Sequence, residues 1–183
     1  MDDIKVTQWF DQEDRRVSQT IRTHGCSLEY VFPSEGDDLP TPFCYTIGLF
    51  GLGHPELLVF GLDHPSAAGL LNHLHGLVAR GRDLVPGELL AFDGHDETYL
   101  VEALPNPGQI LFAANRHYRR PSEFSVPALQ LTWSVGGAFP WDEGYPYALH
   151  SQPRPGDFSA VVDGSGDPGE VADAIVEELR WNA

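Results

Sequence analysis

The sequence predicts a single α+β domain over residues 1–150, with a mixed or mostly antiparallel sheet and helices packed on one of its faces. The chain has 183 residues, of which 42% are hydrophobic, and this is enough for one core. Apolar residues recur with a helical period in some stretches and form short β-type runs in others. These stretches follow the order helix, strands, helix, hairpin, helix, strand, which lacks the regular alternation of a doubly wound fold.

The first expected element is a helix over residues 8–24. Trp9, Val17 and Ile21 gather on one side of it, and Gly25 is a usual helix terminator. Three strands then follow, because short runs rich in aromatic and branched residues lie between turn-forming segments. We expect these strands over residues 26–32, 43–49 and 56–61.

A second helix is expected to begin at Asp63 or His64, since Pro65 is tolerated in a first helical turn. Its leucines recur at helical spacing up to a stop at Gly81. The next stretch predicts a hairpin with Gly94 at its turn, then a helix that ends at Pro121, then a last strand. Their expected ranges are 88–92, 98–104, 109–119 and 128–135. Residues 151–183 are expected to be a loosely ordered tail with a short helix over 170–181.

The charge balance limits the classes of partner. Eleven Lys and Arg against 27 Asp and Glu give a net charge of -16, which repels nucleic acid and anionic membranes. No apolar run approaches the roughly 20 residues of a membrane span, and the first residues do not resemble a signal peptide. We therefore expect a cytoplasmic protein whose partner is a small molecule or a protein, with a homodimer as a further possibility. The two cysteines, Cys26 and Cys44, are expected to be buried thiols.

Motif searches give no cofactor and no metal site. No nucleophile signature, dinucleotide fingerprint or phosphate-binding loop is present. His73 and His75 lie two residues apart on a predicted helix, so their side chains point to different flanks and do not chelate one ion. The acidic turn of residues 93–97 lacks the spacing of a calcium loop and is expected to be solvated.

Two sets of residues stay open as functional candidates. His54 and Glu56 lie two apart on a glycine-rich loop that enters a strand, where they either fix the turn or act as an acid–base pair. Aromatic and polar residues elsewhere suit either a ligand surface or the core. The expected ligand-binding residues among them are Tyr45, Thr46, Arg116, His117 and Trp141.

Three segments carry a resemblance to a known family. They read PFCYTIGL (42–49), GHPELLVFGL (53–62) and, after the strand LQLTW (129–133), FPWDEGY (139–145). Together they resemble a bacterial family catalogued as domain of unknown function 4262. The resemblance implies no activity, but it implies a shared surface, and we expect the Tyr45 strand and the His54 loop to meet the Trp141 loop at one end of the sheet. The positions that the resemblance marks are Tyr45, Thr46, Gly48, His54, Pro55, Glu56 and residues 139–144.

The function expected first is a non-catalytic module that binds a small ligand or a protein. The alternative is a metal-independent hydrolase or isomerase in which His54 is the general base, Glu56 orients it, and Arg116 or Arg119 stabilises an anion. This alternative requires His54 and Glu56 to face one pocket with an arginine nearby. A third possibility is a subunit of a larger assembly, which a broad exposed apolar patch would favour.

Overall fold

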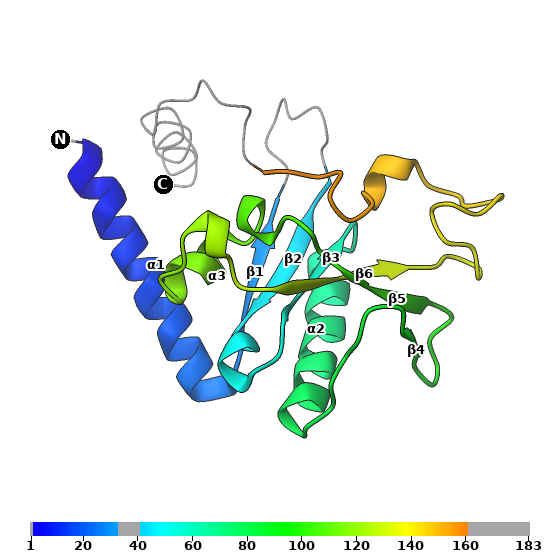
Figure 1. Ribbon diagram of the computed structural model, residues 1–183, viewed down its shortest axis with the longest axis horizontal. Helices are drawn as coiled ribbons and strands as arrows, with labels where there is room; N and C mark the ends of the chain where they lie inside the picture. Colours follow the sequence, from blue (N-terminus) through cyan, green and yellow to red (C-terminus); the bar gives the residue numbers. More distant parts are fainter. Residues whose placement is uncertain (1, 33–40, 161–183) are drawn as a thin grey trace.

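The structure is a computed structural model that describes residues 2–32 and 41–160 (Figure 1). It contains a six-stranded sheet with helices on both faces. Helix α2 (His64–Ala79) packs on one face, while α1 (Asp2–His24) and α3 (Phe112–His117) pack on the other. The α+β class is confirmed, but the expectation that the helices share one face is wrong.

The sheet consists of two antiparallel halves joined by one parallel pair. Its strand order is β1-β2-β3-β6-β5-β4, and every neighbouring pair is antiparallel except β3 and β6. We call β1 to β3 the first half, β4 to β6 the second half, and the β3–β6 pair the seam. The strands are β1 (Ser27–Val31), β2 (Phe43–Ile47), β3 (Glu56–Phe60), β4 (Leu89–Ala91), β5 (Thr98–Ala103) and β6 (Ala128–Trp133).

The central strands explain why both faces carry helices. Every residue of β2, β3 and β6 is buried, so these strands present apolar side chains in both directions and need cover on both sides. Leu57 and Val59 of β3 join the core under α2, whereas Leu58 and Phe60 join the core under α1 and α3. The continuous apolar run of β3 is therefore typical of a strand in the middle of a sheet.

Helix boundaries follow local chemistry. The Asp63 side chain accepts a hydrogen bond of 2.8 Å from the Ser66 amide, and Pro65 occupies the first turn, so α2 begins where the sequence predicts. Helix α3 is shorter than expected, because residues 107–109 form a separate 3-10 turn before it. Helix α1 begins at Asp2, six residues earlier than expected.

Residues 149–160, which we call the C-terminal strap, pack on the sheet ten residues beyond the boundary expected at residue 150. Gln152 is buried, its amide nitrogen donates to the Trp133 carbonyl at 2.8 Å, and its amide oxygen accepts from the Trp133 N–H at 2.8 Å. The strap crosses β3 so closely that a Cβ on Gly61 would lie 2.4 Å from the Ser151 carbonyl oxygen. The helix expected over residues 170–181 lies outside the described residues.

Candidate functional site

His54 is buried and both of its ring nitrogens have protein partners. Nδ1 lies 2.7 Å from the Pro55 carbonyl oxygen, which can only accept, and Nε2 lies 3.1 Å from the Leu84 amide, which can only donate. These partners select the neutral imidazole with its proton on Nδ1. The side chain therefore ties the start of β3 to the segment that follows α2.

Glu56 is fully buried and its carboxylate holds the turn that follows β2. The carboxylate accepts hydrogen bonds from the Thr46 hydroxyl at 2.6 Å and from the amides of Gly48, Leu49 and Phe50 at 2.9, 3.2 and 3.1 Å. Burial raises the pKa of the Glu56 carboxyl above its ordinary value, and these four hydrogen bonds oppose the rise. The Glu56 carboxylate thus supplies the hydrogen-bond acceptors for the backbone amides of this turn.

The expected acid–base pair is therefore engaged in structural hydrogen bonds. His54 bonds to backbone groups on either side of it in space, Glu56 bonds to the turn after β2, and neither side chain is among the residues that line the grooves described below. Arg116, the arginine expected beside them, instead contacts α1. The catalytic hypothesis requires His54 and Glu56 to face one pocket with an arginine nearby, and these residues do not have that arrangement.

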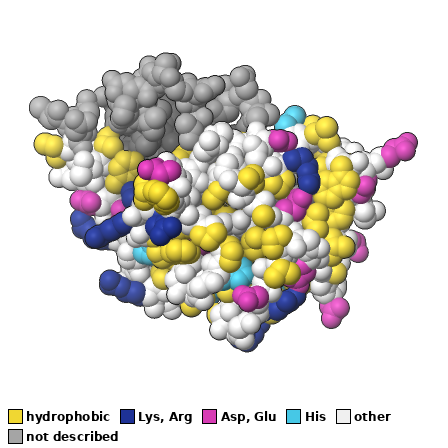
Figure 2. Space-filling model, viewed as in Figure 1, with side chains coloured by type: hydrophobic (Ala, Val, Ile, Leu, Met, Phe, Trp, Pro, Cys, Tyr) yellow, Lys and Arg dark blue, Asp and Glu magenta, His cyan; other side chains and the backbone are white. Residues whose placement is uncertain are grey.

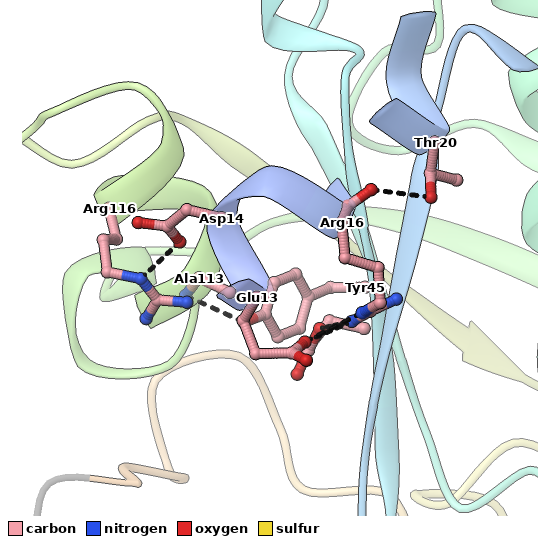
Figure 3. Close-up of polar contacts among 8 residues, drawn as sticks. Glu13, Asp14, Arg16, Thr20, Tyr45, Ala113 and Arg116 are labelled. Atoms are coloured by element: carbon pink, nitrogen blue, oxygen red, sulfur yellow. Dashed lines mark hydrogen bonds and ion pairs between the residues drawn. The ribbon is translucent and has the colours of Figure 1, made fainter. Parts of the chain in front are cut away.

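Tyr45 and Arg116 lie where β2, α1 and α3 meet, and Figure 3 shows their contacts. The buried Tyr45 hydroxyl accepts from the Ala113 amide at 3.1 Å, and burial raises its pKa. Arg116 Nε donates to Asp14 Oδ1 at 2.7 Å, and its guanidinium lies 4.7 Å from the centre of the Phe10 ring. Tyr45 thus attaches α3 to the sheet, and Arg116 ties α3 to α1.

The remaining expected ligand residues are dispersed. Thr46 points away from Tyr45, since neighbouring residues of a strand face opposite sides, and it bonds Glu56. His117 packs edge-on against the Tyr118 ring at 4.7 Å, and partial burial lowers its pKa. Trp141 lies in the loop after β6. The five residues do not form one surface.

The seam separates the His54 and Trp141 loops. Because β3 and β6 run parallel, His54, which precedes β3, and Trp141, which follows β6, lie at opposite ends of the sheet. The expected meeting of these two loops does not occur. Trp141 instead stacks on Phe139 at 4.9 Å, and the Arg154 guanidinium lies 4.2 Å from the centre of the Trp141 ring.

The loop after β6 and the first residue of the C-terminal strap expose several apolar side chains. Trp141 is 48% exposed, Tyr147 54% and Leu149 70%. Figure 2 shows hydrophobic side chains gathered at the right of the molecule, where this loop lies in Figure 1. Trp141 and Leu149 also border a shallow hollow of about 350 Å³ with Pro140 and Arg154. An exposed aromatic patch of this kind is typical of a contact surface.

The largest hollow described is a groove between the N-terminal half of α2 and the β4–β5 hairpin, which we call the α2 groove. Its volume is about 790 Å³, within the range of small-molecule sites. A smaller hollow of about 310 Å³ shares Leu62 and Ser66 with it and extends to Trp133 and Tyr147. The α2 groove is lined by Leu62, Pro65, Ser66, Gly69, Leu70, His73, Ala91, Phe92, Asp93, His95, Glu97 and Tyr99.

The lining of the α2 groove combines aromatic rings with carboxylates. The Phe92 ring lies 4.9 Å from the His73 ring and 5.8 Å from the Tyr99 ring, measured between ring centres. Asp93 and Glu97 contribute the carboxylates, and none of the described residues that line the groove is a lysine or arginine. Within residues 2–32 and 41–160, neither carboxylate takes part in an ion pair.

Sequence reasoning missed this groove. The acidic turn is largely exposed, as expected, but its Asp93, His95 and Glu97 also line a cavity, and His73 lines it from α2. The sequence does show a hairpin rich in ionisable residues. It does not show that this hairpin packs beside α2, because that packing depends on the strand order. His75 lies on another flank of α2, against Gly25, which agrees with the expected divergence of His73 and His75.

Two further features concern metals and membranes. In the described part of the chain, no three His, Cys, Asp or Glu side chains are placed to hold a metal ion. Over the same residues, no helix combines the length and apolar character that crossing a bilayer requires.

The motifs on β2, β3 and the loop after β6 decide the family. A family model described as "Domain of unknown function (DUF4262)" matches residues 20–146. The chain belongs to the DUF4262 family. No curated protein and no solved structure matches it. The DUF4262 match includes His54, Glu56 and the whole α2 groove, whereas the C-terminal strap lies entirely beyond it.

Proposed function

We propose that this protein is a non-catalytic module that binds a small organic molecule in the α2 groove. The observation that carries the proposal is a hollow of about 790 Å³ whose walls are apolar and aromatic and whose rim holds a few ionisable groups. Small-molecule sites have this size and this division between apolar and polar lining. The groove also lies between two different elements, a helix and a hairpin, so that a ligand would contact both.

Gly69 supports the proposal independently. It lies inside α2 and lines the groove, and a Cβ built on it would meet no atom within 4 Å. Glycine inside a helix costs roughly 1 kcal/mol relative to alanine. Close packing within the described protein therefore does not explain the glycine, whereas a groove that must stay open for a ligand does.

The hydrolase or isomerase alternative has less support. A general base needs a ring nitrogen or a carboxylate oxygen that can reach a substrate. His54 and Glu56 use theirs to bond Pro55, Leu84 and the turn after β2. A protein partner is the second candidate, and the exposed loop with Trp141, Tyr147 and Leu149 favours it.

The test is a thermal-shift screen of a metabolite library against the wild type, Gly69→Leu and Gly69→Ala. A leucine side chain at this position projects from α2 and occupies part of the groove, so ligands that raise the denaturation midpoint of the wild type should raise that of Gly69→Leu less or not at all. Alanine adds only a methyl group to the groove wall, so we expect Gly69→Ala to be about 0.5–1 kcal/mol more stable and to reduce the ligand shifts less than Gly69→Leu does. Ligand shifts that persist in Gly69→Leu would place the site elsewhere, and a screen without any shift would favour a protein partner.

A further inference from the structure

We propose that the ligand of the α2 groove is an organic cation, namely an amine, a guanidine or a quaternary ammonium compound with an apolar body. This inference rests on the proposed function and adds the chemical class of the ligand. Charge complementarity is the first argument for it. Asp93 and Glu97 line the groove, no lysine or arginine does, and neither carboxylate has an ion-pair partner among the described residues.

The aromatic lining is the second argument. Phe92 and Tyr99 lie side by side in the groove wall, with ring centres 5.8 Å apart. A cation near the faces of such rings is attracted by their quadrupoles, and more strongly once it leaves water. Burial raises the pKa of the Tyr99 hydroxyl and the nearby Glu97 carboxylate adds to the rise, so one ligand charge can interact with a ring and a carboxylate together.

The remaining lining suits the body of the ligand rather than its charge. Leu62, Pro65 and Leu70 provide apolar surface next to the rings. The imidazoles of His73 and His95 and the Ser66 hydroxyl offer hydrogen bonds of either direction. An anionic ligand, in contrast, would lie against two carboxylates with no arginine or lysine beside it.

The charge of the whole chain acts in the same direction. A net charge of -16 attracts cations and repels anions at long range, most strongly at low ionic strength. This field does not select a site, but it favours the same sign of ligand as the groove lining does.

The experiment compares three probes that share a phenol ring and differ in the charge of one para group of tetrahedral shape. They are 4-hydroxyphenyltrimethylammonium, its neutral isostere 4-tert-butylphenol, and 4-hydroxybenzenesulfonate. We would measure the dissociation constant of each by ligand-observed NMR titration at low and high salt. The proposal predicts that the cation binds about tenfold more tightly than its neutral isostere at low salt, less so at high salt, and that the anion binds most weakly.

Three variants locate the effect. Asp93→Asn and Glu97→Gln each remove one groove carboxylate while keeping the side-chain shape, and both should reduce the preference for the cation several-fold. Glu143→Gln removes the same charge from the exposed loop after β6, away from the groove, and should leave the preference unchanged. Urea denaturation of each variant shows that it is folded.

The outcomes separate the ligand class from the site. If the neutral or anionic probe binds as tightly as the cation, and Gly69→Leu abolishes that binding, the cation proposal is wrong and the α2 groove remains the site. An equal loss of cation preference in Glu143→Gln also overturns the proposal, because it assigns the effect to net charge alone. If no probe binds and no library compound shifts the wild type, both the ligand class and the proposed function are wrong.

Discussion

Single buried polar side chains hold the turns of this protein, and they include residues that resemble a catalytic pair in the sequence. His54 and Glu56 lie two apart on a glycine-rich loop, a spacing that fits acid–base chemistry and turn fixation equally well. The hydrogen-bond partners favour turn fixation over acid–base chemistry, because both imidazole nitrogens and both carboxylate oxygens form hydrogen bonds within the fold. Apart from the Pro55 carbonyl, those partners come from other segments of the chain, so no local pattern could reveal them.

The role of Glu56 predicts a large loss of stability in Glu56→Gln. Each carboxylate oxygen accepts two hydrogen bonds, so an amide NH₂ in place of either oxygen would face donors. We expect the free energy of unfolding to fall by about 2–4 kcal/mol in urea denaturation. Glu143→Gln, at an exposed position, should change it by less than about 0.5 kcal/mol. Equal stability of the two variants would mean that Glu56 does not hold the turn.

Cys26 and Cys44 are predicted to be unreactive in the folded protein. Burial raises the pKa of each thiol to about 12, so the reactive thiolate forms only in strongly alkaline solution. At pH 8 we expect Ellman's reagent to modify neither cysteine in the native protein and both in denaturant, where the ordinary pKa near 8.5 returns. Rapid modification of either thiol without denaturant would show that the sheet near β1 and β2 opens and exposes a cysteine to solvent.

Elements with a strong local signal could be predicted from the sequence, and elements set by distant contacts could not. The start of α2 follows from Asp63 and Pro65, and the strands from their apolar runs. The early end of α3 and the docking of the C-terminal strap were missed. The strap carries little apolar pattern of its own, and it is held instead by contacts such as Gln152 with Trp133.

The strap should depend on Gln152. Its amide group bonds both the N–H and the C=O of Trp133 at the end of β6, so Gln152→Ala leaves two backbone groups without partners. We expect a loss of about 2–4 kcal/mol in unfolding free energy and faster proteolysis within residues 149–160. Leu149→Ala, at a 70% exposed position of the same strap, is the control. Protease resistance equal to that of the control would show that other contacts hold the strap.

At the scale of the whole molecule, the family and the fold class were predictable, but the position of the candidate site was not. The motifs identified the DUF4262 family, and the order of elements gave a mixed sheet. The seam pairs Glu56 with Ala128, 72 residues apart in the chain, and no local pattern encodes that pairing. Because strand order determines which loops are neighbours, the expected meeting of the His54 and Trp141 loops failed, and the α2 groove was not foreseen.

A ligand bound in the α2 groove would contact chain segments from both halves of the sheet. Helix α2 follows the first half of the sheet in the chain, while the hairpin across the groove belongs to the second half. On the proposed function, a molecule bound between them would contact both sections of chain, which already meet along the β3–β6 pair and in the core under α2. Because a ligand that binds only the folded state stabilises that state, occupancy of the groove would raise the free energy of unfolding of the domain.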